Sequence, residues 1–373
     1  MGTMDAFDEE WQLLTTFLPK EWREMACTEG AIQRKRSVKD PDELLRLLLL
    51  HAATGLSLRQ SVARAAILGW PSMSDVALLK RLRSSGTWLK AMAAQMLAAS
   101  RFSAGLPPGF SEKRTIRAVD ATTIQEPGAT GTSWRVHYSI TLPGAECDFY
   151  ELTDVKGGES YKRFPVSKGD LILADRGYSN RAGVAHVIRL EGDVLVRLNS
   201  TSFPLLVRDG QAFDVLEALR NLEGHTPGEW PVSFKYENET FEARLCAIRK
   251  SMESAELAKR RLVERARRKG SQTRPETTEY AEYVVVLTTL PSDSYSVSQI
   301  LELYRLRWQI ELVFKRLKSL MQLGHVPKRT DQSARSWIQA KMLVALLIER
   351  ISAEARFFSP WGFTLQLQTI PLA

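Results

Sequence analysis

The spacing of the apolar residues changes near residue 110, and no other feature of this 373-residue chain constrains its fold as strongly. Before that point apolar side chains recur at helical intervals, as in LLRLLLLHAATGLSLRQSVARAAILGW. After it, short runs rich in β-branched and aromatic residues are separated by glycine and proline. We therefore predict an all-helical N-terminal domain followed by an α/β domain.

The helical part extends over residues 1–108 and has clear start and stop signals. Gly55 breaks the first run, Ser57 is placed to cap the next helix, and SDVALLKRLRSSG begins another capped helix. The second helix of this helix–turn–helix pattern is basic, which suits contact with a DNA groove or phosphates. The alternative is a helical bundle with a solvated basic face. The basic residues in question are Lys80, Arg81 and Arg83.

Residues 109–200 predict a mixed sheet. TIRAVDATTI, WRVHYSITL and CDFYELTDV read as three strands, and LILAD and DVLVRL read as two more with a helix between them. Three strand-like runs recur within 201–292, which we interpret as a β-rich insertion, and 293–373 returns to helices. A basic stretch at 259–269 within the insertion is predicted to be a helix with a solvated face or a DNA backbone contact.

Charge and composition indicate a soluble protein and favour nucleic acid as its partner. No apolar run approaches the roughly 20 residues that span a bilayer, and no signal peptide pattern is present. Cys27, Cys147 and Cys246 lie far apart, as expected in a reducing compartment. The net charge is +8, and residues 301–373 contribute 11 basic and 5 acidic side chains. We predict a cytoplasmic, nucleoid-associated protein without a membrane partner; a merely solubilising surface is the alternative.

Two aspartates occupy positions where carboxylates are uncommon. Asp120 shares a strand face with apolar neighbours in RAVDATTI, where a carboxylate is costly to bury unless it is paired or metal-bound. Asp175 ends the buried strand LILAD, at the edge where α/β sheets place reactive groups. Each could equally be a hydrogen-bonded turn residue, so neither is decisive alone.

The stretch 297–320 is predicted to be one long amphipathic helix. Its apolar residues form a stripe at intervals of three and four: Leu303, Leu306, Ile310, Val313, Leu317 and Leu320. A polar stripe lies opposite: Tyr304, Arg307, Glu311, Lys315 and Lys318. Solvated ion pairs would explain the charged members of this stripe but not the tyrosine.

Three carboxylates brought together would repel one another unless they bind cations. Carboxylate oxygens suit Mg²⁺ or Mn²⁺, and two such ions can activate a hydroxyl and stabilise the leaving oxygen of a phosphodiester. Asp120, Asp175 and Glu311 are the candidates. The sequence has no phosphate-binding P-loop, no HExxH, no GxSxG and no dinucleotide fingerprint.

Tyr304, Arg307, Glu311 and Lys318 match the spacing Y-(2)-R-(3)-E-(6)-K, and in this the sequence resembles the YREK family of bacterial insertion-sequence DDE transposases. VDATTI and LADRGY are similar to that family's first and second acidic motifs. The resemblance implies an RNase H-like core in which Asp120, Asp175 and Glu311 hold two Mg²⁺ or Mn²⁺ ions. It implies cut-and-paste transposition by DNA cleavage and strand transfer.

The resemblance also implies partners and contacts. Tyr304, Arg307 and Lys318 would hold DNA phosphates near a flipped base, and a homodimer would join terminal inverted repeats to target DNA in a synaptic complex. Tyr283 and Trp230 are candidates for stacking on that base, whereas Trp308 is expected to pack. A DNA-binding protein derived from such an enzyme but catalytically inactive or repurposed is one alternative, and a structure-specific nuclease is another.

Overall fold

The computed structural model of the chain describes residues 10–33, 40–70, 73–98, 114–142, 144–199, 201–328 and 330–355. Two compact units make up the chain. The first comprises Met1–Arg101, Thr123–Trp134 and Phe314–Ala373, and the second comprises Phe102–Thr122 and Arg135–Val313. None of the described helices has the length and apolar character needed to cross a membrane.

The first unit is helical, as predicted. Its helices are α2 (Trp22–Thr28), α3 (Pro41–Thr54), α4 (Leu58–Ile67), α5 (Asp75–Ser84), α6 (Gly86–Ala98) and α13 (Asp331–Ala355). Ser57 forms a capping box at the start of α4, and Ser74 caps α5. Gly55 ends α3 with a φ of 69°, a left-handed conformation that favours glycine. The predicted helix break therefore has a backbone cause.

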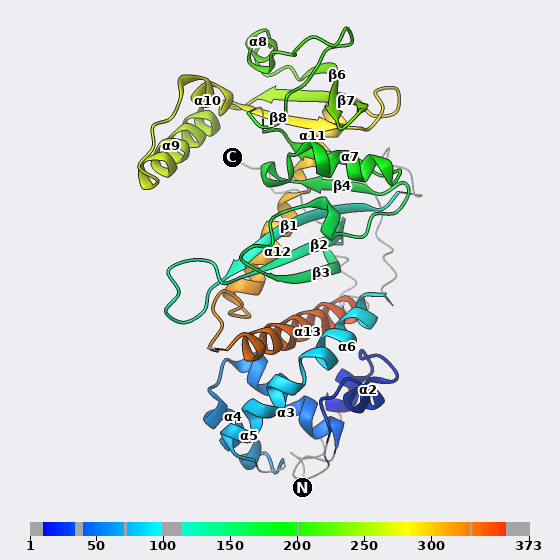
Figure 1. Cartoon of the computed structure of the whole chain (residues 1–373), viewed down its shortest axis with the longest axis vertical. Helices are drawn as coiled ribbons and strands as arrows, with labels where there is room; N and C mark the ends of the chain where they lie inside the picture. Colours follow the sequence, from blue (N-terminus) through cyan, green and yellow to red (C-terminus); the bar gives the residue numbers. More distant parts are fainter. Residues whose placement is uncertain are drawn as a thin grey trace. The chain divides into compact units, whose positions relative to one another are not determined.

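Within this unit α13 packs along α3, α5 and α6 (Figure 1). The approach is close at Gly86, where an added Cβ would lie 2.6 Å from Ser336 Oγ. Trp22 and Trp88 are buried and stack with ring centroids 6.1 Å apart. Trp88 Nε1 also donates to the Trp22 carbonyl at 2.8 Å, so the indole has the partner that a buried N–H requires.

The second unit holds an eight-stranded sheet with the order β3-β2-β1-β4-β5-β8-β7-β6. The strands are β1 (Ile116–Ile124), β2 (Trp134–Leu142), β3 (Glu146–Asp154), β4 (Leu171–Ala174), β5 (Asp193–Arg197), β6 (Gly228–Tyr236), β7 (Glu239–Arg249) and β8 (Tyr283–Thr288). β4 is parallel to β1 and β5, and β8 is antiparallel to β5. This mixed sheet confirms the α/β class, and its first five strands follow the order of the predicted RNase H-like core.

The three strand-like runs predicted in 201–292 form β6, β7 and β8. β8 pairs with β5 along one edge and with β7 along the other, so β6 and β7 extend the core sheet. The physical reason is that β8 is almost wholly buried, and buried backbone groups on both of its edges need partners. The β-rich stretch 201–292 is therefore continuous with the core sheet.

Helices cover both faces of this sheet. α7 (Arg181–Arg189) packs on β5 and β6, over an apolar cluster that includes Val119, Ile172 and Val194. α11 (Val297–Arg305) packs on β5 and β7 and contributes nothing to that cluster, so it lies on the opposite face. The remaining elements are α8 (Val215–Arg220), α9 (Met252–Arg268), α10 (Pro275–Tyr280), α12 (Trp308–Ser319) and the 3-10 turns η1 (Tyr161–Arg163) and η2 (Arg176–Tyr178).

Candidate active site

The parallel register of β1 and β4 brings two aspartates together. Val119 is paired with Ala174, so one further step along both strands places Asp120 beside Asp175. Side chains alternate between the faces of a sheet, so both aspartates lie opposite to Val119 and Ala174, which belong to the cluster under α7. They therefore lie on the face that α11 covers.

Backbone amides hold both carboxylates in place. Asp120 Oδ1 accepts from the Ala121 N–H at 2.7 Å, and Asp175 Oδ1 accepts from the Gly177 N–H at 2.8 Å, which caps η2. Burial raises the pKa of Asp120 to about 7, and the negative charge of Asp175 adds to the shift. The fold thus keeps two carboxyl groups close together at a cost in electrostatic energy.

Glu311 is connected to this pair through Arg307. The Arg307 guanidinium donates to Glu311 Oε1 and forms an ion pair with it. Burial alone would lower the pKa of Arg307, but Tyr304 and Glu311 raise it above its usual value, and Asp120 contributes in the same direction. Arg307 is 14% exposed in its side chain and lies 5.7 Å from the centroid of the Tyr304 ring. The third candidate acid, Glu311, is therefore bound to an arginine whose charge also acts on Asp120.

The single long helix predicted at 297–320 is wrong, because α11 ends at Arg305 and α12 begins at Trp308. Between them the Leu306 N–H donates to the Leu303 carbonyl at 3.0 Å and the Arg307 N–H donates to the Tyr304 carbonyl at 3.1 Å. These i→i+3 bonds wind the chain more tightly than an α-helix and shift the phase of the residues that follow.

Ile310, Val313 and Leu317 are buried as predicted, but three other positions differ from expectation. Tyr304 is only 9% exposed, so it does not line a solvated stripe. Trp308, expected to pack, is 56% exposed, and Leu320, expected in the apolar stripe, is 78% exposed. Lys318 is exposed on α12 and belongs to the first unit, whereas Tyr304, Arg307 and Glu311 belong to the second.

Glu159 is a fourth carboxylate of the site that the sequence reasoning missed. A Cβ added at Gly177 would overlap the Glu159 carboxylate and lie 3.1 Å from Asp175 Oδ1, so both acids adjoin the same turn. Burial raises the pKa of Glu159, and Asp175 adds to the shift. In the sequence this glutamate stands in GGES, before a short helical turn. Nothing in that pattern predicts that it lies near LADRGY.

Two tyrosines of the cluster under α7 are influenced by the charges of these carboxylates. Tyr161 and Tyr178 are fully buried, with ring centroids 5.3 Å apart. Neither hydroxyl has a hydrogen-bond partner among the residues that the structure describes. Burial raises the pKa of Tyr178, and Asp120 leads the charges that add to the shift. Among the described residues, these two hydroxyls are therefore buried donors without an acceptor.

The basic residues predicted on the N-terminal helix–turn–helix have different environments. Lys80 is exposed on α5. Arg81 is half-buried and donates to the Ala31 carbonyl at 3.3 Å, so part of its guanidinium serves the bundle. Arg83 is also half-buried, and its backbone carbonyl accepts from Ser336 Oγ at 3.3 Å. Of the three, Lys80 is the side chain most available to a ligand.

The two aromatic candidates for base stacking lie in or against the core. Tyr283 is 4% exposed and belongs to the cluster under α7. Trp230 is half-buried against the same cluster, with its ring centroid 6.3 Å from that of Phe213. Neither presents a free ring face comparable with that of Trp308.

The chemical type of the available ligands, carboxylate oxygens, suits a hard divalent cation. Asp120 and Asp175 are adjacent oxygen ligands, and their mutual repulsion would be relieved by a cation. Within the described ranges, however, no three acidic, histidine or cysteine side chains are arranged to hold one metal ion. Glu311 is instead bound to Arg307.

Comparison with known families shows which family the chain belongs to. The profile of the family described as "Transposase DDE domain" matches residues 154–347, and the chain belongs to this family of transposases, which catalyse DNA cleavage and strand transfer.

Particular relatives are transposases of insertion sequences. The chain is 36% identical to transposase InsL for insertion sequence element IS186A of Escherichia coli strain K12, over 96% of this chain and 98% of that protein. It is also 36% identical, with the same coverage, to the transposase for insertion sequence element IS421 of Escherichia coli. A piggyBac transposase synaptic complex with hairpin DNA matches with a TM-score of 0.48 and 10% identity, over 92% of this chain and 75% of that chain.

Proposed function

We propose that this protein moves an insertion sequence by cut and paste, cleaving DNA at the element's ends and joining them to target DNA. Asp120, Asp175 and Glu311 are its catalytic acids. The observation that carries the proposal is the β1–β4 register, which sets Asp120 beside Asp175 on the face covered by α11. The ion pair between Arg307 and Glu311, with the charge of Arg307 acting on Asp120, supports the third assignment.

The three acids would hold the divalent cations, two Mg²⁺ or Mn²⁺. Bound there, the cations would activate the attacking hydroxyl or water and stabilise the leaving oxygen of the phosphodiester. The protein's own part is to fix the carboxylates: amides of Ala121 and Gly177 orient Asp120 and Asp175, and Arg307 orients Glu311.

Arg307, Tyr304 and Lys318 are proposed to contact DNA phosphates. Support comes from Arg307, because its planar guanidinium group can bind a phosphate through two hydrogen bonds. Its Nε has no hydrogen-bond partner among the described residues. Lys318 is exposed and would act as a point charge. Tyr304 lies under the guanidinium and would hold its orientation.

Residues 1–108 are proposed to bind the terminal inverted repeats through α5, with Lys80, Arg81 and Arg83 as contacts. Target DNA and a second copy of the chain, as a homodimer, would complete a synaptic complex. Removal of residues 1–100 is expected to eliminate end-specific binding and leave weak, salt-sensitive affinity. End recognition by the truncated protein equal to that of the full chain would contradict this assignment.

The direct test incubates the purified protein with linear DNA carrying its element's own ends, with and without Mg²⁺. Cleavage at the ends only in Mg²⁺, absent in Asp175→Asn, is the expected result. A protein that binds the ends but cuts nothing in Mg²⁺ or Mn²⁺ would instead be a DNA-binding derivative of a transposase. Cleavage at branched structures without end preference would indicate a structure-specific nuclease.

A further inference from the structure

Three cations gather next to Asp175, around the end of α10. Arg176 lies 5.5 Å from the centroid of the Tyr280 ring. The Tyr280 hydroxyl donates to the carbonyl of Leu198, the residue after Arg197. Lys250 Nζ donates to the carbonyl of Ala281, the residue after Tyr280. Arg176, Arg197 and Lys250 thus come from three different elements and meet at one short segment.

Strand register ties this cluster to the catalytic edge of the sheet. Ala174 of β4 is paired with Val196 of β5, so the next residues along the two strands, Asp175 and Arg197, are neighbours. Arg176 follows Asp175 directly. In the order β1, β4 and β5, the parallel strands therefore place Asp120, Asp175 and Arg197 side by side.

The three cations are not neutralised by the protein. Among the residues that the structure describes, no carboxylate lies at ion-pair distance from any of them, although all three are half-buried. Burial lowers the pKa of Lys250 to about 8, and the charges of Arg197 and Arg176 add to the shift. An uncompensated, partly desolvated group of cations costs free energy in the absence of an anion.

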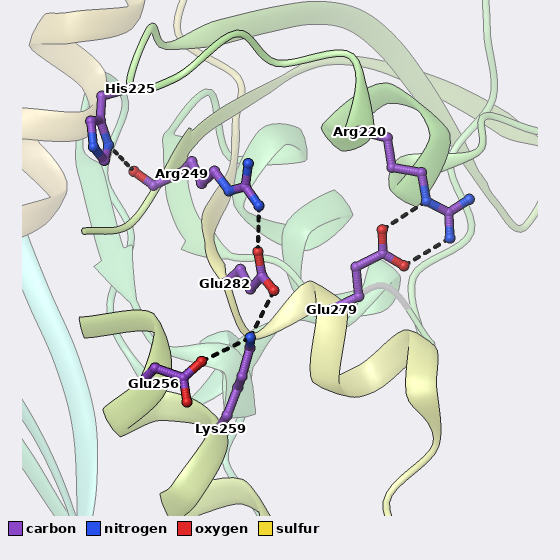
Figure 2. Close-up of polar contacts among 7 residues, drawn as sticks. All are labelled: Arg220, His225, Arg249, Glu256, Lys259, Glu279 and Glu282. Atoms are coloured by element: carbon purple, nitrogen blue, oxygen red, sulfur yellow. Dashed lines mark hydrogen bonds and ion pairs between the residues drawn. The ribbon is translucent and has the colours of Figure 1, made fainter. Parts of the chain in front are cut away.

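The adjacent surface, shown in Figure 2, is built differently. Glu282 accepts from Arg249 at 2.8 Å and from Lys259 at 2.9 Å, and Lys259 also binds Glu256 at 3.1 Å. Arg220 and Glu279 form two parallel bonds of 2.7 Å. Each arginine and lysine drawn there has an acidic partner within the chain, unlike Arg176, Arg197 and Lys250.

We propose that Arg176, Arg197 and Lys250 form a phosphate-binding site that holds one strand of the DNA substrate beside Asp175. This rests on the proposed function. The two guanidinium groups can each bind a phosphate through two hydrogen bonds, and the lysine adds a point charge.

The occupant is a DNA strand, not a small phosphate, because the positive charge continues beyond the cluster. α9 begins two residues after Lys250 and carries a run of exposed cations. They are Arg260, Arg261, Arg265, Arg267, Arg268 and Lys269. A polyanion can contact both the cluster and this helix, whereas one free phosphate cannot.

The first test measures binding of Lys250→Met and Arg197→Met to linear duplex DNA over a range of salt concentrations, without divalent metal. We expect each variant to bind roughly tenfold or more weakly. The slope of log K against log salt should fall by about 0.9 for each lost phosphate contact. Arg220→Met, the matched control from Figure 2, removes a cation that is paired with Glu279 and lies off α9, and it should bind like the wild type. Unchanged affinity and slope in both test variants would overturn the proposal.

Thermal unfolding of the same variants separates binding from a structural role. Removing one of three repelling cations should leave the melting temperature unchanged or raise it when DNA is absent. Variants that melt at lower temperature and keep the wild-type salt slope would show that the cations are structural. Asp175→Asn tests the catalytic assignment independently: if it cleaves DNA while Lys250→Met still loses affinity, the proposed function fails and the phosphate site stands.

Selective acylation of Lys250 at pH 8 identifies the source of the phosphate. DNA should protect this amine, and inorganic phosphate at the same phosphate concentration should not. Equal protection by inorganic phosphate would replace the DNA strand with a small-anion site and overturn the assignment.

Discussion

Asp148 and Asp170 are both ion-paired to Arg117, whereas Asp120 and Asp175, in the same sheet, have no arginine between them. Arg117 reaches Asp148 Oδ2 at 2.6 Å and Asp170 Oδ2 at 2.9 Å. Asp170 Oδ2 also accepts from the Ser167 N–H at 2.7 Å. Among the described residues no ion pair joins a cation to Asp120 or Asp175, because the nearby Arg307 is paired with Glu311.

The difference separates a pair neutralised within the fold from the pair proposed to be catalytic. Burial raises the pKa of Asp148, and Arg117 opposes this shift, so the fold itself supplies the counter-charge. Burial and the charge of Asp175 raise the pKa of Asp120 to about 7, and the charge of Arg307 offsets only part of this shift. Carboxylates whose counter-charge must come from outside the chain are expected at a metal-dependent site.

The largest expected effect is on catalysis at the unpaired aspartates. Asp175→Asn should lower DNA cleavage in Mg²⁺ by at least roughly a thousandfold, because metal stabilisation of the transition state is worth several kcal/mol. DNA binding should persist, since phosphate contacts supply it. Cleavage and binding assays on the same preparation measure both. Asp170→Asn is the control, and its folded molecules should cleave DNA at the wild-type rate. Near wild-type cleavage by Asp175→Asn would remove the distinction between the two pairs of aspartates.

The second effect is on stability at the paired aspartates. Arg117→Met leaves two buried carboxylates without a counter-charge and should lower the free energy of unfolding by about 3–5 kcal/mol. Urea denaturation measures it. Lys168→Met breaks an exposed ion pair with Glu191 in the same unit and should cost less than about 1 kcal/mol. Equal effects of the two substitutions would mean that the Arg117 network is not structural.

The third expected effect is a gain in stability, which we predict when Asp120 is replaced by Asn. Its native pKa of about 7 lies above the usual 3.8, so its contribution to stability falls as pH rises from about 4 through 7. Asp120→Asn does not titrate and should be as stable as the wild type near pH 4. It should be more stable by up to about 4 kcal/mol at pH 8 without metal.

Thermal melts in metal-free buffer at pH 5 and pH 8 measure this difference, and added Mg²⁺ should then stabilise the wild type alone. A pH-independent difference would mean that Asp120 is not held in the environment described above.

The smallest expected effect concerns the cations of the YREK positions. Arg307→Ala should reduce cleavage by roughly 10–100-fold through lost phosphate contact and lost orientation of Glu311. Lys318→Ala should cause a smaller loss, and Lys315→Ala, also exposed on α12 but outside the signature, should cause none. Cleavage rates with melting temperatures check this. Normal cleavage by all three, or simple unfolding of the signature variants, would leave these residues with a structural role.

The fold class was predictable because apolar spacing encodes it directly. The strands around Asp120 and Asp175, the caps at Ser57 and Ser74, and the break at Gly55 all depend on a few neighbouring residues. The helix at 297–320 was mispredicted because one apolar stripe fits both a continuous helix and two helices joined by a tight turn. The hydrogen bonds at Leu306 and Arg307 decide between them, and no residue type there marks a break.

The sequence by itself determined which residues carry reactive groups and which periodicity surrounds them, because these properties are local. It could not determine that Glu159 adjoins Asp175, that Arg117 neutralises Asp148 and Asp170, or that Arg197 lies beside Asp175. Strand register and loop packing bring those groups together across tens of residues. Burial then sets their electrostatic energies, and only the tertiary structure decides both.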